Sequence, residues 1–398
     1  MSTYLTADIP GTGGVFKETD EDFLVAEIPA YLPCGEGEHL YVEIEKRGIT
    51  TLEAIRRIGR ALNLPEREIG YAGMKDSRGI TRQIFSLPRI RPEAALELAL
   101  PGIRILSARR HRNKLKLGHL RGNRFRVRIR EAGEGTIERA AAVVAVLEAR
   151  GVPNYFGSQR YGGQGNSHLI GRALVRQDFR EAVDALMGDP AAITDQRWRE
   201  AVEAYRRGEH GEAVRLFPGF CRTEREVAER LARRPDAFEQ AFHAVHPRLK
   251  KLYISALQSW LFDRLLEERL DSFDQVEEGD LAFRHDNGAC FLVTDAAVEA
   301  SRAARQEISP TGPLFGCRMT LPAGAQRERE ERLLAAEGLT LEQFELPGGL
   351  RMDGERRPYR VPLGEPVLEQ EGNDLLLSFS LPKGSYATTV LDEIMKTP

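Results

Sequence analysis

Two runs near the start of the chain alternate polar with apolar residues, and this period constrains the fold more than any other feature. Residues 15–31 read VFKETDEDFLVAEIPAY and residues 38–46 read EHLYVEIEK. A period of two places every second side chain on the same face of a strand, so each run predicts a strand with one buried face. A helix is expected next, with Thr50 or Thr51 as its N-cap, followed by a strand over residues 71–79.

A strongly basic stretch follows. Residues 104–130 contain eleven lysines and arginines and no acidic residue, although the net charge of the whole chain is -3. Residues 114–120 and 124–130 alternate again, and a tight connection at Gly122 and Asn123 predicts that they form a basic hairpin. Arginines on one strand face repel each other unless phosphates or carboxylates neutralise them, so the hairpin favours an RNA partner; a solvated strand face is the alternative. The candidate RNA contacts are Arg124, Arg126 and Arg128.

The residue composition of the chain changes after residue 150. A length of 398 residues favours two domains, or one domain with a large insertion. Residues 136–150 predict a helix that ends at Gly151, and about 100 residues of mostly helical, highly charged sequence follow the glycine-rich segment after it. Strands are expected again towards the C-terminus, and turn-forming residues predict a loop over residues 308–319. A separate unit is therefore expected to begin after Gly151.

Several classes of protein find no support in the sequence. The N-terminus lacks the basic and apolar regions of a signal peptide, and no apolar run is long enough for a membrane span, so a cytoplasmic protein is expected. The four cysteines lack the spacing of a zinc site or a disulfide framework. No zinc-deaminase motif, phosphate-binding glycine loop or GxSxG motif occurs. The sequence therefore predicts an activity that requires neither a metal nor a cofactor.

Asp76 is the candidate catalytic carboxylate. An isolated Lys-Asp pair after a strand is usually an exposed turn, and Lys75 and Asp76 are expected to point to opposite faces. Gly73 and Ser77 leave the backbone around Asp76 uncrowded, which suits a carboxylate that approaches a bulky substrate. An aspartate is ionised at pH 7, so it can act as a nucleophile without an activating base.

Five segments occur in a characteristic order, and they read FKETDEDFLVAEIP, YAGMKDSRGITRQ, HRNKLKLGHLRGNRFRVRIR, GVPNYFGSQRYG and LPKGSYATTVLDEI. Together they resemble the TruD family of tRNA pseudouridine-13 synthases. The resemblance implies an α+β (mixed α/β) fold, in which an antiparallel-sheet catalytic domain is interrupted by an inserted α/β TRUD domain. By that analogy residues 1–150 and 341–398 form the catalytic domain and residues 151–340 the insertion. The charged region over residues 175–250 carries little of the resemblance.

The resemblance also implies roles for single residues. Asp76 matches the catalytic aspartate, and Lys17 matches a basic residue that keeps this carboxylate ionised and oriented. The substrate-contacting positions are matched by Phe23, Asn123, Phe125 and Tyr386. Phe125 resembles the aromatic that stacks on the target base, although strand alternation places it on the buried face. Tyr386 stands where the family often has phenylalanine, and its hydroxyl needs a hydrogen-bond partner or water.

The implied reaction converts uridine-13 of tRNA to pseudouridine. Uracil leaves ribose C1′, rotates and rejoins through C5, and the sequence leaves open whether Asp76 attacks C1′, attacks C6 or abstracts the C2′ proton. The expected partner is tRNA, and the expected oligomeric state is a monomer. The basic hairpin alone would also suit a non-catalytic RNA-binding protein. Another tRNA base-modifying enzyme, such as a methyltransferase, is disfavoured because no cofactor-binding glycine loop occurs on a βα unit.

Overall fold

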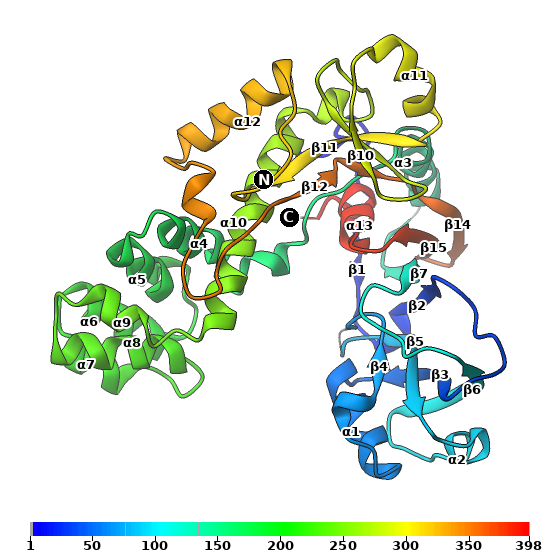
Figure 1. The fold of residues 1–398 in the computed structure, drawn as a ribbon, viewed down its shortest axis with the longest axis horizontal. Helices are drawn as coiled ribbons and strands as arrows, with labels where there is room; N and C mark the ends of the chain where they lie inside the picture. Colours follow the sequence, from blue (N-terminus) through cyan, green and yellow to red (C-terminus); the bar gives the residue numbers. More distant parts are fainter. Residues whose placement is uncertain (1–2, 76, 134, 398) are drawn as a thin grey trace. The chain divides into compact units, whose positions relative to one another are not determined.

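The computed structural model describes residues 3–75, 77–133 and 135–397. The chain divides into two compact units (Figure 1). Unit 1 consists of residues 1–152 and 361–398, and unit 2 of residues 153–360. Within the described part of the chain, no helix is both long and apolar enough to cross a membrane.

Unit 1 is built on one large sheet, to which both ends of the chain contribute. Its strands are β1 (Val15–Phe16), β2 (Phe23–Pro29), β3 (His39–Arg47), β4 (Gly70–Tyr71), β5 (Ile80–Pro88), β6 (Ile103–His111), β7 (Leu120–Arg130), β14 (Gly364–Glu371) and β15 (Asp374–Pro382). The main order is β14-β15-β7-β2-β5-β3-β6, with β1 paired to β7 and β4 to β5. The pairs are antiparallel except for β2 with β5, which is parallel. The mixed α+β fold expected from the sequence is confirmed.

The helices of unit 1 follow the expected signals. They are η1 (Asp20–Asp22), α1 (Thr51–Ala61), η2 (Glu66–Glu68), α2 (Pro92–Leu96), α3 (Thr136–Arg150) and α13 (Ala387–Met395). Thr50 caps α1, because its hydroxyl accepts a hydrogen bond from the backbone N–H of Glu53. Gly151 ends α3 at a φ of 89°, a conformation that disfavours side chains other than glycine.

Two separate apolar cores lie on the same face of this sheet. Register and alternation place Val25, Phe125, Phe85 and Val42 on one face, because Val25 lies opposite both Phe125 and Thr81, and Phe85 lies opposite Val42. The first core, here called the α3–α13 core, joins β2, β7 and β15 to helices α3 and α13. The second, here called the α1 core, joins β3, β5 and β6 to helix α1.

The predicted basic hairpin is wrong. Strands β6 and β7 are not neighbours in the sheet, and residues 114–119 are not a strand. Of the two leucines whose alternation suggested a strand, Leu115 packs with Tyr41, Ala72 and Leu120 in a small cluster, whereas Leu117 is exposed. Gly122 was expected in a turn but lies within β7, where a Cβ atom would approach the carbonyl oxygen of Leu381 to 2.2 Å. The glycine therefore serves close strand pairing rather than a reversal of the chain.

The expected strand over residues 71–79 is also shorter than predicted. Only Gly70 and Tyr71 form β4, and the chain leaves the sheet from Ala72 onward among the described residues. Backbone groups of Ala72, Gly73 and Lys75 form hydrogen bonds with side chains and with a loop instead of with a neighbouring strand.

Unit 2 combines helices with a small sheet. Its helices are α4 (Ser167–Val175), α5 (Phe179–Met187), α6 (Gln196–Arg206), α7 (His210–Leu216), α8 (Arg222–Arg233), α9 (Phe238–Phe242), α10 (Pro247–Glu268), α11 (Ala296–Ala304) and α12 (Gly324–Ala336), with short 3-10 turns η3 (Ser158–Tyr161), η4 (Pro190–Ala192), η5 (Leu270–Ser272) and η6 (Glu342–Phe344). The sheet has the order β10 (Cys290–Leu292), β9 (Leu281–Arg284), β11 (Ile308–Leu314) and β12 (Glu355–Pro358). Helix α10 packs against α4, β11 and α12, so it forms the centre of this unit.

Strand β11 lies where the sequence predicted a loop, and that prediction is wrong for Ile308–Leu314. Its prolines suggested a turn, but a proline loses only the N–H donor and keeps its carbonyl acceptor. The carbonyl of Pro310 accepts a hydrogen bond from the backbone of Tyr359, which shows how the strand tolerates this residue.

The chain passes between the units within β8 (Val152–Pro153) and β13 (Arg360–Val361). The sequence placed the corresponding boundaries after residues 150 and 340. Residues 341–360 belong to unit 2, where strand β12 pairs with β11. The tertiary pairing of a short strand therefore decides where the second boundary falls.

His285 of unit 2 generates a prediction on stability. Burial, and then the charge of Arg360, lower the pKa of His285 to about 4, and its Nε2 lies 2.8 Å from the Ser309 hydroxyl. The unfolded chain binds this proton below pH 6.5, whereas the folded chain does not until about pH 4. The contribution of His285 to stability is therefore present above pH 6.5 and is lost as the pH falls towards 4, at most by about 1.4 kcal/mol per pH unit.

We expect the melting temperature of wild type to exceed that of His285→Gln by less at pH 5 than at pH 7, because the variant lacks the titrating ring. Thermal unfolding followed at both pH values measures this difference. A gap between the two proteins that does not change with pH would contradict the assignment.

Candidate active site

A set of buried polar side chains separates the two cores on the face that they share. This polar seam, as it is called below, consists of Glu27, Thr51, Lys75, Thr81, Gln83 and Asn123. The seam extends over neighbouring strands of the sheet. Glu27 of β2 lies opposite Asn123 of β7, and Thr81 of β5 lies opposite Val25 of β2. Thr51, Thr81 and Gln83 are at most 2% exposed. Since buried polar groups cost free energy unless they are bonded, this interruption of an apolar face marks a candidate functional site.

A buried ion pair lies at the centre of the seam. The Lys75 ammonium is 2.8 Å from Glu27 Oε1, and the side chains are 9% and 3% exposed. The other carboxylate oxygen of Glu27 accepts a hydrogen bond from the backbone of Ile84 at 3.3 Å. Lys75 therefore has its ionic partner on strand β2, away from its sequence neighbour Asp76.

Two further side chains hold the backbone that precedes Asp76. The hydroxyl of Thr51 accepts a hydrogen bond from the Lys75 N–H at 2.8 Å and donates to Gln83 Oε1 at 3.0 Å. The amide of Gln83 donates in turn to the carbonyl of Gly73 at 3.3 Å. Helix α1 and strand β5 thus fix the segment from Gly73 to Lys75.

The segment that follows Asp76 is fixed as well. Gly79 adopts a φ of 110° and donates its N–H to Asp20 Oδ1 at 3.0 Å. A Cβ atom at Gly79 would lie 2.4 Å from the carbonyl oxygen of Phe23, so only glycine fits there. Asp76 itself, the predicted catalytic residue, lies outside the described residues. The structure describes the anchors on both sides of it.

Lys17 follows β1 in a left-handed conformation, with a φ of 63°. Its ammonium lies 4.0 Å from the centre of the Phe23 ring and 5.5 Å from that of Phe16. A cation over an aromatic face is attracted by the ring quadrupole, so the two phenylalanines hold the charge of Lys17 in place. The sequence-predicted residues Lys17 and Phe23 are therefore in contact.

Asn123 and Phe125 lie on the core face of β7. Asn123 is half-buried, and its Oδ1 is buried and finds no hydrogen-bond partner among the described residues. Phe125 is 6% exposed; its ring stacks on Phe379 at 5.2 Å between centroids and is tilted against Phe23 at 6.2 Å. The alternation that placed Phe125 in the core is thus observed, and its suggested role in stacking on a base stays a prediction.

Tyr386 is half-buried and occupies the N-cap position of helix α13. It lies four residues after Pro382, the last residue of β15, and Leu381 of that strand pairs with Asn123. The neighbouring hydroxyls of Ser385 and Thr388 are buried and have no hydrogen-bond partner within the described part of the chain. Together with the Oδ1 of Asn123, they provide polar atoms that a polar ligand can satisfy.

The arginines of β7 are more nearly neutralised than the sequence indicated. Arg124 pairs with Glu365 at 2.7 Å, Arg128 with Glu371 at 2.7 Å and Asp374 at 3.0 Å, and Arg130 with Asp22 at 2.7 Å. The hydrogen bonds that the Arg128 guanidinium donates to Glu371 and Asp374 raise the pKa of Arg128 above its ordinary value. The inference of an uncompensated basic strand is therefore wrong for these three residues, because their carboxylate partners lie far away in the sequence.

Arg126 differs from Arg124, Arg128 and Arg130. It is exposed, and no carboxylate of the described residues lies within ion-pair distance of its guanidinium. The RNA contacts suggested for Arg124, Arg126 and Arg128 stay predictions.

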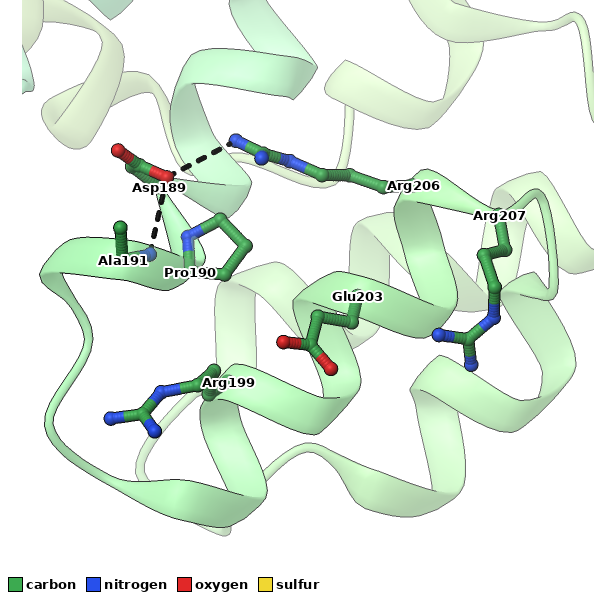
Figure 2. Close-up of a pocket in the computed structure, with 7 residues that line it drawn as sticks. All are labelled: Asp189, Pro190, Ala191, Arg199, Glu203, Arg206 and Arg207. Atoms are coloured by element: carbon green, nitrogen blue, oxygen red, sulfur yellow. Dashed lines mark hydrogen bonds and ion pairs between the residues drawn. The ribbon is translucent and has the colours of Figure 1, made fainter.

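Unit 2 contains a hollow of about 680 Å³ between η4 and α6 (Figure 2). Its lining residues are Asp189, Pro190, Ala191, Arg199, Glu203, Arg206 and Arg207. Arg206 points towards Asp189, and the two charged groups are 3.6 Å apart with both side chains more than half exposed. Exposed pairs of this kind neutralise each other without creating a binding site, so the polar seam of unit 1 is the better candidate.

Metal-ligating residues do not converge within the described ranges, where no group of three or more histidine, cysteine or acidic side chains could hold a metal ion. Cys34, Cys221, Cys290 and Cys317 are all free thiols.

The sequence analysis missed Glu27, Thr51 and Gln83. A signal for Glu27 was present, since it continues the core-facing series of Phe23 and Val25 with a charged residue. A charge at a core-facing position of an alternating strand requires a buried partner.

Comparisons with known proteins agree on one family. Residues 1–394 match the family model described as tRNA pseudouridine synthase D (TruD). The chain is 67% identical over 393 residues to the tRNA pseudouridine synthase D of Geobacter metallireducens, covering 99% of this chain and 97% of that protein. It is 66% identical over 397 residues to the protein of the same description from Geobacter sulfurreducens, covering 100% of this chain and 97% of the relative. The fold is similar to a crystal structure assigned to tRNA pseudouridine synthase D of Methanosarcina mazei, with a TM-score of 0.85, 28% identity and coverage of 100% and 96% of the two chains.

The buried pair of Glu27 and Lys75 generates a prediction on stability. Removing one partner leaves the other charge buried and unpaired, so Glu27→Gln and Lys75→Met should each lower the free energy of unfolding by about 3–5 kcal/mol. The double variant should recover a large part of this loss, because it leaves no buried charge. Urea unfolding of the three variants measures the coupling.

The exposed pair of Glu21 and Arg47 is the matched control, since its side chains are 56% and 53% exposed. Glu21→Gln should leave the midpoint of urea unfolding close to that of wild type, because exposed ion pairs contribute little to stability. Strictly additive losses in the Glu27→Gln/Lys75→Met variant would show that the two residues do not act as a buried pair.

Proposed function

We propose that this chain, which belongs to the TruD family of tRNA pseudouridine synthases, isomerises uridine-13 of tRNA to pseudouridine with Asp76 as the catalytic carboxylate. The proposal assigns unit 1 to the catalytic domain and unit 2 to the inserted TRUD domain. A cytoplasmic location and a monomeric state, both expected from the sequence, belong to the same proposal.

One observation carries the proposal beyond family membership. The polar seam interrupts an apolar sheet face and anchors the backbone at Gly73 and Lys75, which precede Asp76, and Asp20 anchors Gly79, which follows it. A catalytic group is effective when the surrounding structure holds it in a defined geometry. Buried hydrogen bonds and a buried ion pair fix the short segments on either side of Asp76. This attachment supports a catalytic role for Asp76.

The reaction balances without an added reactant. The bond between N1 and C1′ breaks, a bond between C5 and C1′ forms, and the C5 proton is released to solvent while N1 gains a proton. The product has the mass of the substrate, and no electrons are transferred to another molecule. Asp76 acts by attack on C1′, by attack on C6 or by removal of the C2′ proton, and the three routes stay open.

Lys17 is assigned the task of keeping the Asp76 carboxylate ionised. A cation close to a carboxylate favours its charged form, and a catalytic aspartate must be charged to act as a nucleophile or base. The contacts of Lys17 with the rings of Phe16 and Phe23 support this assignment, because they hold the ammonium in a defined position.

Asn123 is assigned the recognition of the uracil edge. Its buried Oδ1 is an acceptor without a partner in the described residues, and its NH2 group supplies donors. The edge of uracil carries both hydrogen-bond acceptors and a donor, so the amide can pair with it. Tyr386, half-buried beside the end of β15, is the more accessible stacking residue. Phe23 and Phe125 are 8% and 6% exposed, so they offer a base little more than a ring edge.

We expect Asp76→Asn to abolish pseudouridine formation while the dissociation constant for tRNA stays within about threefold, because the amide keeps the shape of the side chain and loses its charge. Tritium release from [5-³H]uridine-labelled tRNA measures the activity. Asp189→Asn, a change of the same kind in the exposed hollow of unit 2, is the control and should keep its activity. Turnover by Asp76→Asn at the wild-type rate would end the catalytic assignment.

Mapping the product on a tRNA transcript separates the competing functions. Carbodiimide mapping should find one new pseudouridine at position 13, and mass spectrometry should find an unchanged mass. A gain of a methyl mass would favour a methyltransferase, whereas binding without any modification would favour an RNA-binding protein.

A further inference from the structure

The structure separates the basic residues of the stretch 104–130 into two groups. Five face a carboxylate within ion-pair distance: Arg104, Arg112, Arg124, Arg128 and Arg130. The other six have no such partner among the described residues: Arg109, Arg110, Lys114, Lys116, Arg121 and Arg126. Of these six, Arg110 and Lys114 already donate to backbone carbonyls, of Glu38 at 3.2 Å and of Arg67 at 2.7 Å.

Two of the remaining cations flank one turn beside the polar seam. Lys116 and Arg121 are exposed and lie on either side of Gly118, in a turn closed by a hydrogen bond from the His119 N–H to the carbonyl of Lys116 at 3.1 Å. The N–H of Gly118 donates to the carbonyl of Ala72 at 2.8 Å. Ala72 is four residues before Asp76, so the turn is attached to the segment that leads to the catalytic position.

A third cation joins them from the other end of the chain. Lys383, which is exposed, donates its backbone N–H to the carbonyl of Arg121 at 2.9 Å and its ammonium to the carbonyl of Gly118 at 3.2 Å. These hydrogen bonds join the segments that carry the three cations, and like charges on joined segments repel each other unless an anion neutralises them. The three cations, Lys116, Arg121 and Lys383, are named the basic rim below.

Exposed apolar side chains accompany this rim. Met74 is 60% exposed and Leu117 is 66% exposed, and they lie on the two segments that the bond between Gly118 and Ala72 joins. Large apolar side chains exposed next to a cluster of cations suit a nucleotide, which presents a charged phosphate and an apolar base face. A simple counterion would use only the charges.

We propose that the basic rim binds backbone phosphates of the substrate tRNA beside the target uridine, while Met74 and Leu117 contact an unstacked neighbouring base. The inference rests on the proposed function, since it names where the substrate of that reaction is held. It moves the phosphate contacts from Arg124 and Arg128, which pair with carboxylates, to the turn bonded to Ala72 and the first residues of β7.

The size of the effect follows from counterion release. Each phosphate contact contributes about 0.7–0.9 to the slope of log K against log salt concentration. Three contacts therefore contribute about 2–3 to that slope, and removing them should weaken binding most at low salt.

The test compares two variants of the full-length protein in tRNA binding at 50, 100 and 200 mM salt. Lys116→Gln/Arg121→Gln/Lys383→Gln should bind tRNA at least about tenfold more weakly at 50 mM, with a slope that is smaller by about 2–3. Arg124→Gln/Arg128→Gln removes cations that carboxylates already neutralise, so its slope should change by less than about 1. Each single rim variant should flatten the slope by about 1, which keeps the test valid if the triple variant fails to fold.

Single-turnover measurements at saturating tRNA complete the test. At saturating tRNA the rim variants should recover most of the rate that they lose at subsaturating tRNA, because the rim binds the substrate and does not react. An unchanged salt slope in the rim variants overturns the proposal, as does a larger loss in Arg124→Gln/Arg128→Gln. Failure of the proposed function would give a different result. The wild-type protein would then form no pseudouridine, whatever the slope of its tRNA affinity against salt concentration.

Discussion

The ion pair between Glu27 and Lys75 is the interaction on which the site depends. Both charges are almost entirely removed from water, and a pair so placed is retained only when its geometry and additional hydrogen bonds offset the desolvation. Glu27 comes from a central strand and Lys75 from the segment before Asp76, so the bond ties a loop to the sheet. Thr51 and Gln83 complete this attachment from helix α1 and strand β5.

The two ends of the chain meet at this site because β15 pairs with β7. Leu381 lies opposite Asn123, and the turn after β15 brings Lys383 to the loop that contacts Ala72. The insertion of more than 200 residues in unit 2 therefore interrupts the sequence of the sheet without interrupting its hydrogen bonding. A sheet assembled in this way gives the C-terminal residues, including Tyr386, positions beside strands formed at the other end of the chain.

Local sequence patterns predicted several strands and helices, but they did not predict which strands pair or which charged residues form ion pairs. Alternation correctly predicted β3 and the core position of Phe125, and capping residues predicted the start of α1 and the end of α3. The strand expected over residues 15–31 is only partly confirmed, because η1 separates β1 from β2. The prediction of a basic hairpin failed because Leu115 and Leu120 of KLKLGHL pack in a small cluster from a loop, which a period of two cannot distinguish from a strand. The carboxylate partners of Arg124 and Arg128 could not be predicted, because they lie more than 240 residues away in sequence. Asp76 was identified by the family motif, and the buried pair at Lys75 was visible only once register placed Glu27 beside it.

The central claim is that uracil enters the polar seam between the α3–α13 core and the α1 core. A crystal structure of the Asp76→Asn variant bound to tRNA tests this most directly. The account predicts a uracil flipped out of the tRNA, with one edge within about 3 Å of the Asn123 amide and its sugar beside residue 76. A target base bound anywhere else in the protein, with Asn123 left unpaired, would contradict it.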